Sequence, residues 1–410
     1  MQGVGSVNMS MGGASTGQPL DISGALHWNP AAITVFKDNQ ARFDLGLFFS
    51  SPEVSSTVPV FDGNGQPTGQ FVSGTTEDDR GVSPLPALAY KMASTSKHHF
   101  GFSAFGISGF GVTFPESNTN PINFPQSQGG FGRVESNYTL LQVGVAYAYQ
   151  LTDKLSVGVQ PTLNMGSLDL TPNPTANPTQ AGYPSTDGAA TAFGFGAQFG
   201  VFFDSGTGFK AGASYKTTQT FGDFEFDNVY LDGTDGTNEF NLDYPAILSF
   251  GVGYSAGNFD LALDYRNVYY ENTDGFEASG WTQTASVAGF GWENITILSA
   301  GIQYKGVNKL PLRLGYTYSS NPIRDDLAFF SVPATAIIKN AFQVGVGYEL
   351  TDRWQIDGVF HYGTSGDATS GPLLNPQFAQ NFPPNGAIPG SEVSYDMTTS
   401  MFMFGAQYKW

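Results

Sequence analysis

The sequence has 410 residues with 52 glycines, no cysteine, 13% charged residues and 14% aromatic residues. Its net charge of −18 argues against a nucleic-acid partner, because phosphate binding needs clustered Lys and Arg. The lack of cysteine excludes disulfides and Cys-ligated metal sites, and no apolar run approaches the ~18 residues of a spanning helix. We therefore expect a large all-β protein without a cofactor.

Residues 1–40 lack sustained alternation of apolar and polar side chains. They are rich in glycine, and apolar residues such as Met9, Leu26 and Trp28 are too frequent for a solvated tail. We predict a compact plug, or hatch, formed by residues 1–40 inside the lumen of a barrel formed by residues 41–410. A flexible periplasmic tail is the alternative.

The rest of the chain alternates with a period of two, which is typical of two-faced strands. Residues 259–265 illustrate it, since Phe259, Leu261 and Leu263 alternate with Asp260 and Ala262. A soluble β-sandwich would alternate in the same way. The predicted strands are longer than is usual in soluble proteins, and aromatic residues near their ends fit membrane interfaces. Fourteen strands are predicted, near 41–50, 85–93, 98–107, 137–150, 154–166, 192–203, 208–218, 246–256, 257–269, 294–306, 309–319, 340–350, 353–363 and 398–410.

The connections between these strands alternate strictly between short and long. Short periplasmic turns and long extracellular loops are typical of outer-membrane barrels. The sequence therefore predicts a 14-stranded antiparallel transmembrane β-barrel.

The final strand alternates to the last residue, with Phe402, Tyr408 and Trp410 on one face. An aromatic terminal strand resembles the signal read by the bacterial outer-membrane assembly machinery. No signal peptide is visible, so we expect the mature form of a bacterial outer-membrane protein, with its signal peptide absent from the chain.

Three long loops carry apolar residues that could line a ligand groove or could equally pack against each other, and the third of them contains Leu373, Leu374, Phe378 and Phe382. The candidate groove residues are Phe110, Phe114, Phe124, Phe131, Leu327, Phe329, Phe330 and Ile337.

Short motifs point to a family. Ser10-Met11-Gly12-Gly13-Ala14, followed by Asn29-Pro30-Ala31, resembles the hatch of the FadL/TodX family of outer-membrane transporters for hydrophobic compounds. Pro86 to Tyr90 and Leu312 to Tyr316 are also similar to this family. The candidate hatch motif consists of Gly12, Gly13, Ala14, Asn29, Pro30 and Ala31.

The resemblance implies passive uptake of a hydrophobic small molecule, either a long-chain fatty acid or a hydrocarbon. The ligand would be captured by extracellular loops, pass the hatch and leave sideways at a kink in strand 3. Gly101, Gly106, Gly109 and Gly111 interrupt that strand and could form the kink, or they could simply pack against the plug. The expected surroundings are outer-membrane lipids and lipopolysaccharide, and the expected state is a monomer.

Other functions have weaker sequence support. A general porin shares the barrel, but opposing charge rings are not evident on the predicted lumen faces. Residues 13–17 match the Gly-x-Ser-x-Gly pattern of a hydrolase, without the required strand–turn–helix context, so we expect no enzyme. The acidic run from Asp223 to Asp243 could bind calcium but matches no EF-hand spacing, so we predict no metal site. Arg133, Arg266, Arg313 and Arg324 are candidates for contacting a ligand carboxylate.

Overall fold

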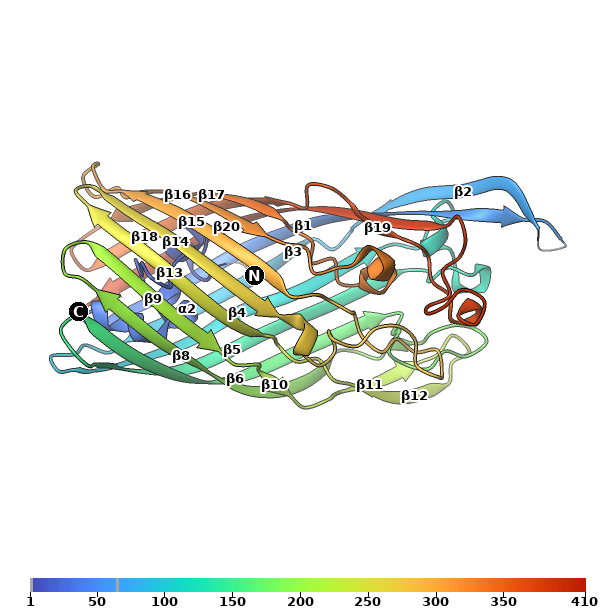
Figure 1. Ribbon diagram of the computed structural model, residues 1–410, viewed down its shortest axis with the longest axis horizontal. Helices are drawn as coiled ribbons and strands as arrows, with labels where there is room; N and C mark the ends of the chain where they lie inside the picture. The colour runs from blue at the N-terminus through green and yellow to red at the C-terminus, as the bar shows by residue number, and fades with distance from the viewer. Residues whose placement is uncertain (1–2, 64–65) are drawn as a thin grey trace.

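The computed structural model describes residues 3–63 and 66–410, and its main feature is one antiparallel sheet that closes on itself (Figure 1). The first and last wall strands pair from Gln40↔Lys409 to Thr57↔Glu392, which completes the barrel. The prediction of a 14-stranded antiparallel barrel is confirmed. The wall strands are β1 (Gln40–Phe61), β3 (Val82–Lys91), β4 (His98–Phe114), β5 (Val134–Gln150), β6 (Leu155–Thr171), β8 (Ala190–Asp204), β9 (Phe209–Lys216), β13 (Ala246–Ala256), β14 (Phe259–Tyr269), β15 (Ile295–Tyr304), β16 (Leu312–Ser319), β17 (Asn340–Glu349), β18 (Trp354–Thr364) and β20 (Glu392–Lys409).

The two faces of the wall differ in chemistry because the strands alternate. Large apolar side chains point outward, and Phe195 and Phe404 are 67% and 64% exposed. A protein surrounded by water rarely exposes so many aromatic rings, whereas the lipid-facing surface of a membrane barrel consists largely of apolar and aromatic side chains. The inward face carries buried polar groups such as Asp44, Gln142 and Asp264.

Short turns join the strands at the end of the barrel that holds the C-terminus, and the long connections gather at the opposite end (Figure 1). The long connections contain structure of their own. Their strands are β2 (Pro67–Glu77), β7 (Ser185–Thr186), β10 (Thr220–Phe221), β11 (Phe224–Val229), β12 (Asp235–Phe240) and β19 (Thr369–Gly371). Their short 3-10 helices are η2 (Pro121–Asn123), η3 (Gln126–Gln128), η4 (Tyr270–Asn272), η5 (Asp325–Ser331) and η6 (Pro376–Phe378).

The predicted end of the first strand at residue 50 is wrong. β1 continues to Phe61 and pairs with β2 in a hairpin that projects beyond the barrel (Figure 1). β1 continues through Pro52 and Pro59 although proline removes a backbone donor. Proline is nevertheless tolerated at positions where that donor is not needed, and the buried residues Pro52, Val54 and Ser56 preserve the alternation.

The N-terminal segment, residues 3–39, contains α1 (Ser6–Ser10), α2 (Ile22–Trp28) and η1 (Pro30–Val35). It lies inside the barrel, since α1 contacts β16, β17 and β18, α2 contacts β3 and β4, and η1 contacts β5, β6 and β8. All residues of α1 and α2 are buried. Within the described part of the chain, no helix has both the length and the apolar character to cross a membrane.

Candidate functional site

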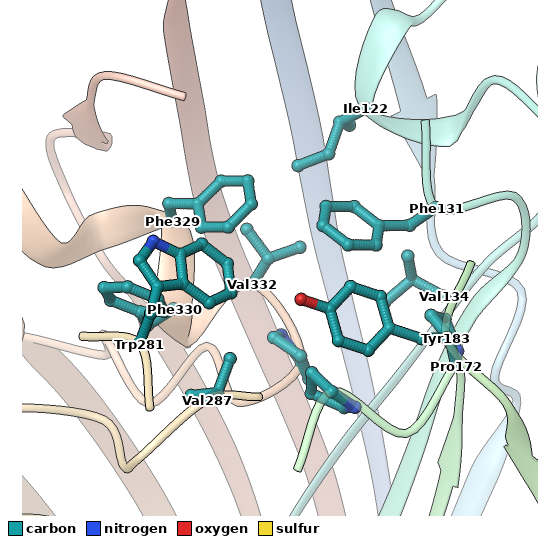
Figure 2. Close-up of a pocket in the computed structure, with 12 residues that line it drawn as sticks. Ile122, Phe131, Val134, Pro172, Tyr183, Trp281, Val287, Phe329, Phe330 and Val332 are labelled. Atoms are coloured by element: carbon teal, nitrogen blue, oxygen red, sulfur yellow. The ribbon is translucent and has the colours of Figure 1, made fainter. Parts of the chain in front are cut away.

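An apolar cavity lies among the long connections, and we call it the outer pocket (Figure 2). The empty volume between its walls, counted together with the part that is open to solvent, is about 460 Å³. Ligand pockets of this kind are typically concave and mostly apolar. Its walls come from four long connections and the start of β5: Ile122, Phe131, Val134, Pro172, Pro174, Tyr183, Trp281, Val287, Phe329, Phe330, Val332 and Pro333.

The lining of the outer pocket contains no charged side chain. Its two polar side-chain groups are already bonded to backbone. The Tyr183 hydroxyl donates to the Ala285 carbonyl at 2.6 Å, and Trp281 Nε1 donates to the Asn385 carbonyl at 3.0 Å. Aromatic contacts connect the walls, with ring centroids of Phe131 and Phe329 5.5 Å apart and those of Trp281 and Phe330 5.0 Å apart. The pocket therefore offers rings and aliphatic groups to an occupant.

The structure brings together some of the predicted groove residues and separates others. Phe131, Phe329 and Phe330 line the outer pocket. Four others lie outside its lining, namely the buried residues Phe114, Leu327 and Ile337 and the partly buried Phe124. Tyr183 and Trp281 come from connections in which we predicted no groove, and their aromatic character was the only available signal.

Phe110, the remaining predicted groove residue, belongs to a second group that we call the inner aromatic cluster. Its ring centroid lies 4.9 Å from that of Tyr138 and 6.1 Å from that of Phe290. The cluster continues through closely spaced rings, namely Phe276, Phe290, Trp292 and Tyr270. The larger cluster of buried apolar side chains runs from Phe329 to Leu26 of the N-terminal segment. Contacts between apolar side chains therefore connect the outer pocket with that segment, although buried polar groups such as Gln142 also face the interior.

The backbone ladder of the wall is interrupted beside Phe110. β3 pairs with β1 over its whole length, but it pairs with β4 only over residues 87–91, opposite residues 101–105. Residues 82–86 of β3 and 106–110 of β4 therefore have no ladder between them, and we call this the lateral gap. β4 also carries a bulge between Gly106 and Ser108 in its pairing with β5. Pro84 and Pro86 suit an unpaired strand edge, because proline has no N–H to leave unsatisfied.

The four glycines predicted to form a kink occupy different environments. A Cβ on Gly101 would meet Leu26 Cδ2 of the N-terminal segment at 2.7 Å. Gly106 flanks the bulge and faces Pro86 across the gap, where a Cβ would make only ordinary contacts. A Cβ on Gly109 would meet the Tyr138 carbonyl at 2.7 Å, and at Gly111 the Arg80 guanidinium occupies the space a Cβ needs. Packing against the plug thus explains Gly101 but not the other three.

The Asn29-Pro30-Ala31 motif attaches the N-terminal segment to the wall. Asn29 Oδ1 accepts from the Ala31 N–H at 3.1 Å and begins η1, while Asn29 Nδ2 donates to the carbonyls of Thr16 and Val201, each at 3.0 Å. Glycines on three adjacent strands face this motif. A Cβ on Gly158 would lie 2.5 Å from the Ala31 nitrogen, and one on Gly200 would meet Asn29 Oδ1.

The Gly12-Gly13-Ala14 motif makes a similar close approach on the other side of the lumen. Gly12 has a φ of +68°, a conformation that favours glycine, and a Cβ there would lie 2.6 Å from the Tyr316 carbonyl. The Gly13 carbonyl accepts from Arg266 Nη2 at 2.6 Å, and Ala14 is buried beside Met11. Both predicted motifs therefore lie where the N-terminal segment meets the wall.

Two buried ionic clusters on the wall also hold this segment. In the first, Arg42 Nη2 is 2.9 Å from Asp44 Oδ1, and Arg42 Nη1 is 2.9 Å from Asp357 Oδ2. Asp44 Oδ1 accepts from the backbone and hydroxyl of Ser6, and Asp21 Oδ2 lies 3.4 Å from Arg42 Nε. Burial raises the pKa of Asp21 to about 6, since the nearby Arg42 only partly offsets the cost of desolvating its carboxylate.

In the second cluster, Asp264 Oδ2 accepts from the backbone N–H groups of Ser15 and Thr16 at 2.8 and 2.9 Å. Arg266 pairs with Asp264 at 2.7 Å, and its guanidinium carbon lies 3.5 Å from the ring centroid of Trp28. The sequence did not identify Arg42, Asp44 or Asp264, because their roles depend on which strands face the segment.

The four arginines considered for a ligand carboxylate already have acidic partners. Arg266 and Arg313 are paired with Asp264 and Asp357 inside the barrel. The other two form exposed pairs, Arg133–Glu135 and Arg324–Asp326, both at 2.7 Å. None of the four lines the outer pocket.

The structure also shows the surroundings of the hydrolase-like serine, of the acidic run and of the C-terminal aromatic residues. Ser15 is buried among N-terminal residues, and the described residues give its hydroxyl no hydrogen-bond partner. Glu225 lies directly opposite Glu239 in the β11–β12 hairpin, and the described residues contain no group of three or more His, Asp or Glu arranged around a possible metal. Phe402 of β20 and Trp410, directly after β20, are exposed, and the Tyr408 ring stacks on that of Trp410 and is tilted against that of Trp354.

These features define a membrane-spanning β-barrel with an apolar outer pocket and a lumen occupied by its own N-terminal segment. The family model described as "Outer membrane protein transport protein (OMPP1/FadL/TodX)" matches residues 2–410. The chain therefore belongs to this family of bacterial outer-membrane transport proteins, which comprises transport channels and not enzymes.

Solved structures share the fold at low sequence identity. The toluene transporter TodX of Pseudomonas putida has a TM-score of 0.72 at 19% identity, with 100% of this chain and 99% of that chain covered. A FadL homologue of Pseudomonas aeruginosa has a TM-score of 0.72 at 14% identity, covering 100% and 98%. The toluene transporter TbuX of Ralstonia pickettii has a TM-score of 0.66 at 17% identity, covering 100% and 99%. The search of curated protein sequences finds no significant match.

Proposed function

We propose that this protein is a passive channel for hydrophobic small molecules. The observation that carries the proposal is the uncharged, ring-lined outer pocket at the loop end of the barrel. An apolar solute gains about 0.8 kcal/mol for each CH₂ group removed from water, so such a pocket can extract it without an energy source.

We further propose neutral hydrocarbons, in preference to long-chain fatty acids, as the ligands. A carboxylate buried without a partner carries a large desolvation cost. The outer pocket provides no cation, and the candidate arginines are paired elsewhere. The likeness to the toluene transporters TodX and TbuX supports this choice. The likeness to a FadL homologue is the reason to test a fatty acid beside the hydrocarbons.

The proposed route continues from the outer pocket through the inner aromatic cluster to the lateral gap. Phe110 connects the two, because its ring contacts Tyr138 and Phe290 and its strand borders the gap. Leu45 and Leu47, which pair with residues 84–86 of β3, are exposed on the outer wall. A molecule leaving through the gap would therefore enter the hydrocarbon layer of the membrane directly.

In the same proposal the N-terminal segment acts as the hatch that separates the lumen from the periplasm. Its attachment to the wall by hydrogen bonds and ion pairs supports this role.

We also propose that the C-terminal strand β20, together with Trp410, is recognised by the outer-membrane assembly machinery through Phe402, Tyr408 and Trp410. The barrel would function as a monomer surrounded by lipids and lipopolysaccharide.

Binding measurements with three probes test the ligand class. Toluene, decane and oleate would be titrated into the purified protein and into the Phe330→Ala variant. We expect toluene and decane to bind the parent, and Phe330→Ala to weaken binding about tenfold, because a lost aromatic contact of ~1.4 kcal/mol corresponds to that factor. Phe71→Ala, on the projecting hairpin where Phe71 is 57% exposed, is the matched control. Binding of oleate alone that depends on an arginine would contradict neutral ligands, and an unaltered Phe330→Ala variant would contradict the pocket.

A further inference from the structure

The side chain of Arg80 crosses the wall at the extracellular end of the lateral gap, next to two hydrogen bonds that join residues 78–79 to Thr113 of β4. Residues 78–81 connect β2 to β3, and Arg80 extends from this connection across β4 to β5. We infer that Arg80 is a latch that sets the length of the lateral gap and hence the width of the molecules that leave through it. This inference rests on the proposed lateral release.

The contacts of Arg80 span three strands. Its Nη1 donates to the Ser136 carbonyl and its Nη2 to Asn137 Oδ1, each at 2.7 Å, on β5. Its Nε lies 3.4 Å from Ser83 Oγ, on the β3 side of the gap. The guanidinium thus links β3 to β5 and passes over β4, which lies between them.

Gly111 provides the place where the guanidinium crosses β4. Arg80 Nη1 lies where a Cβ of residue 111 would be, so any other residue would displace the arginine. The neighbouring backbone fixes the connection to the same strand, since the Asp79 N–H donates to the Thr113 carbonyl at 2.8 Å and the Thr113 N–H donates to Asp78 Oδ1. The gap is therefore bounded at one end by the Arg80 crossing together with these two hydrogen bonds, and at the other end by the β3–β4 ladder, which begins at Ala87.

Arginine suits this position better than lysine would. Its planar guanidinium directs separate N–H groups at two acceptors and can lie flat over a glycine, whereas an ammonium is a compact point charge. The latch also adjoins the outer pocket, because Ser136 Oγ donates to the carbonyl of Pro333, which lines that pocket.

Thiol accessibility tests the latch without any ligand. The chain has no cysteine, so Ser108→Cys introduces a single thiol on the β4 side of the gap. Its rate of modification by a hydrophobic maleimide would be measured in lipid vesicles, alone and with Arg80→Ala, Arg80→Lys or Asn137→Ala. Arg133→Ala is the control, because Arg133 is an exposed arginine paired only with Glu135.

We expect Arg80→Ala to raise the modification rate several-fold, Arg80→Lys and Asn137→Ala to raise it less, and Arg133→Ala to leave it unchanged. An unchanged rate in Arg80→Ala would overturn the latch. Retained heat-modifiable migration in gels would show that each variant still forms the barrel.

Uptake measurements then test the effect on specificity. The ratio of naphthalene to hexane uptake should rise in Arg80→Ala and stay constant in Arg133→Ala, since a longer gap favours the wider molecule. A raised thiol reactivity with a constant uptake ratio would overturn the assigned role in selection. If the proposed function itself is wrong, the parent protein will take up neither naphthalene nor hexane. The thiol assay will still report on the gap in that case, so this result can be told apart from a failure of the latch.

Discussion

At the scale of single residues, the lumen contains charges that act as attachments. Arg42 is buried and lies beside Asp21, Asp44 and Asp357, and two of these acids belong to the wall. A buried arginine with carboxylates around it is costly to remove, because the remaining charges lose their partner.

Arg42→Met should therefore lower the free energy of unfolding by about 3–5 kcal/mol, the usual effect of breaking a buried ion pair. Arg324→Met, which breaks an exposed pair, should change it by less than about 1 kcal/mol. Urea unfolding in lipid vesicles, followed by tryptophan fluorescence, measures both. Equal effects would show that the Arg42 cluster contributes no more than a surface pair.

Asp21 predicts a pH dependence of the attachment. Its pKa is about 6 when the segment is docked, against an ordinary value of 3.8, so the docked form holds the proton more strongly. Docking should weaken as the pH rises from about 4 to about 6 and stay constant above that. Leak conductance in planar bilayers should consequently be higher at about pH 7.5 than at about pH 5. Asp21→Asn, which retains the capping oxygen for Gly24, should lose this difference.

At the scale of elements, the N-terminal segment meets the wall through glycines. Asn29, Pro30 and Ala31 face Gly158, Gly200 and Gly212 on β6, β8 and β9. Side chains at these wall positions would hold the segment away from the strands. The abundance of glycine in the sequence is thus partly a requirement for close backbone contact in the lumen.

Gly212→Ala should partly displace the segment, because its Cβ would collide with the Thr16 carbonyl, which is backbone and cannot rotate away. We expect a higher leak conductance and faster proteolysis within residues 3–36. Gly358→Ala on β18 should behave like the parent, since its Cβ would lie 3.8 Å from Phe404. A tight Gly212→Ala channel would mean that the contact is not needed for closure.

At the scale of the whole molecule, the wall pairs remain complete without the N-terminal segment. Arg42 keeps Asp44 and Asp357, Arg313 keeps Asp357, and Arg266 keeps Asp264. The barrel closes through β1 and β20, which do not require the segment.

Deletion of residues 2–36 should therefore give a barrel that inserts but leaks. Single-channel recording should show a steady, large current from the deletion variant and a small one from the parent. A large steady current from the parent itself would instead favour a general porin, and unchanged conductance after deletion would mean that the segment does not close the lumen.

The sequence by itself determined the barrel, because side-chain alternation and the regular exchange of short and long connections are local properties of the chain. It also located the Gly12-Gly13-Ala14 and Asn29-Pro30-Ala31 motifs and three lining residues of the outer pocket. It missed the continuation of β1 beyond residue 50, which depends on pairing with β2 and β20.

Only the tertiary structure decided which distant residues share a site. Tyr183 and Trp281 join Phe329 in the outer pocket from separate connections, and Arg80 reaches Ser136 over a glycine of another strand. The lateral gap is likewise a property of pairing, since residues 82–86 belong to β3 and pair with β1 but have no partner on β4. Alternation tells which face of the wall a side chain occupies, but neither the register between strands nor the folding of the loops onto one another can be read from it.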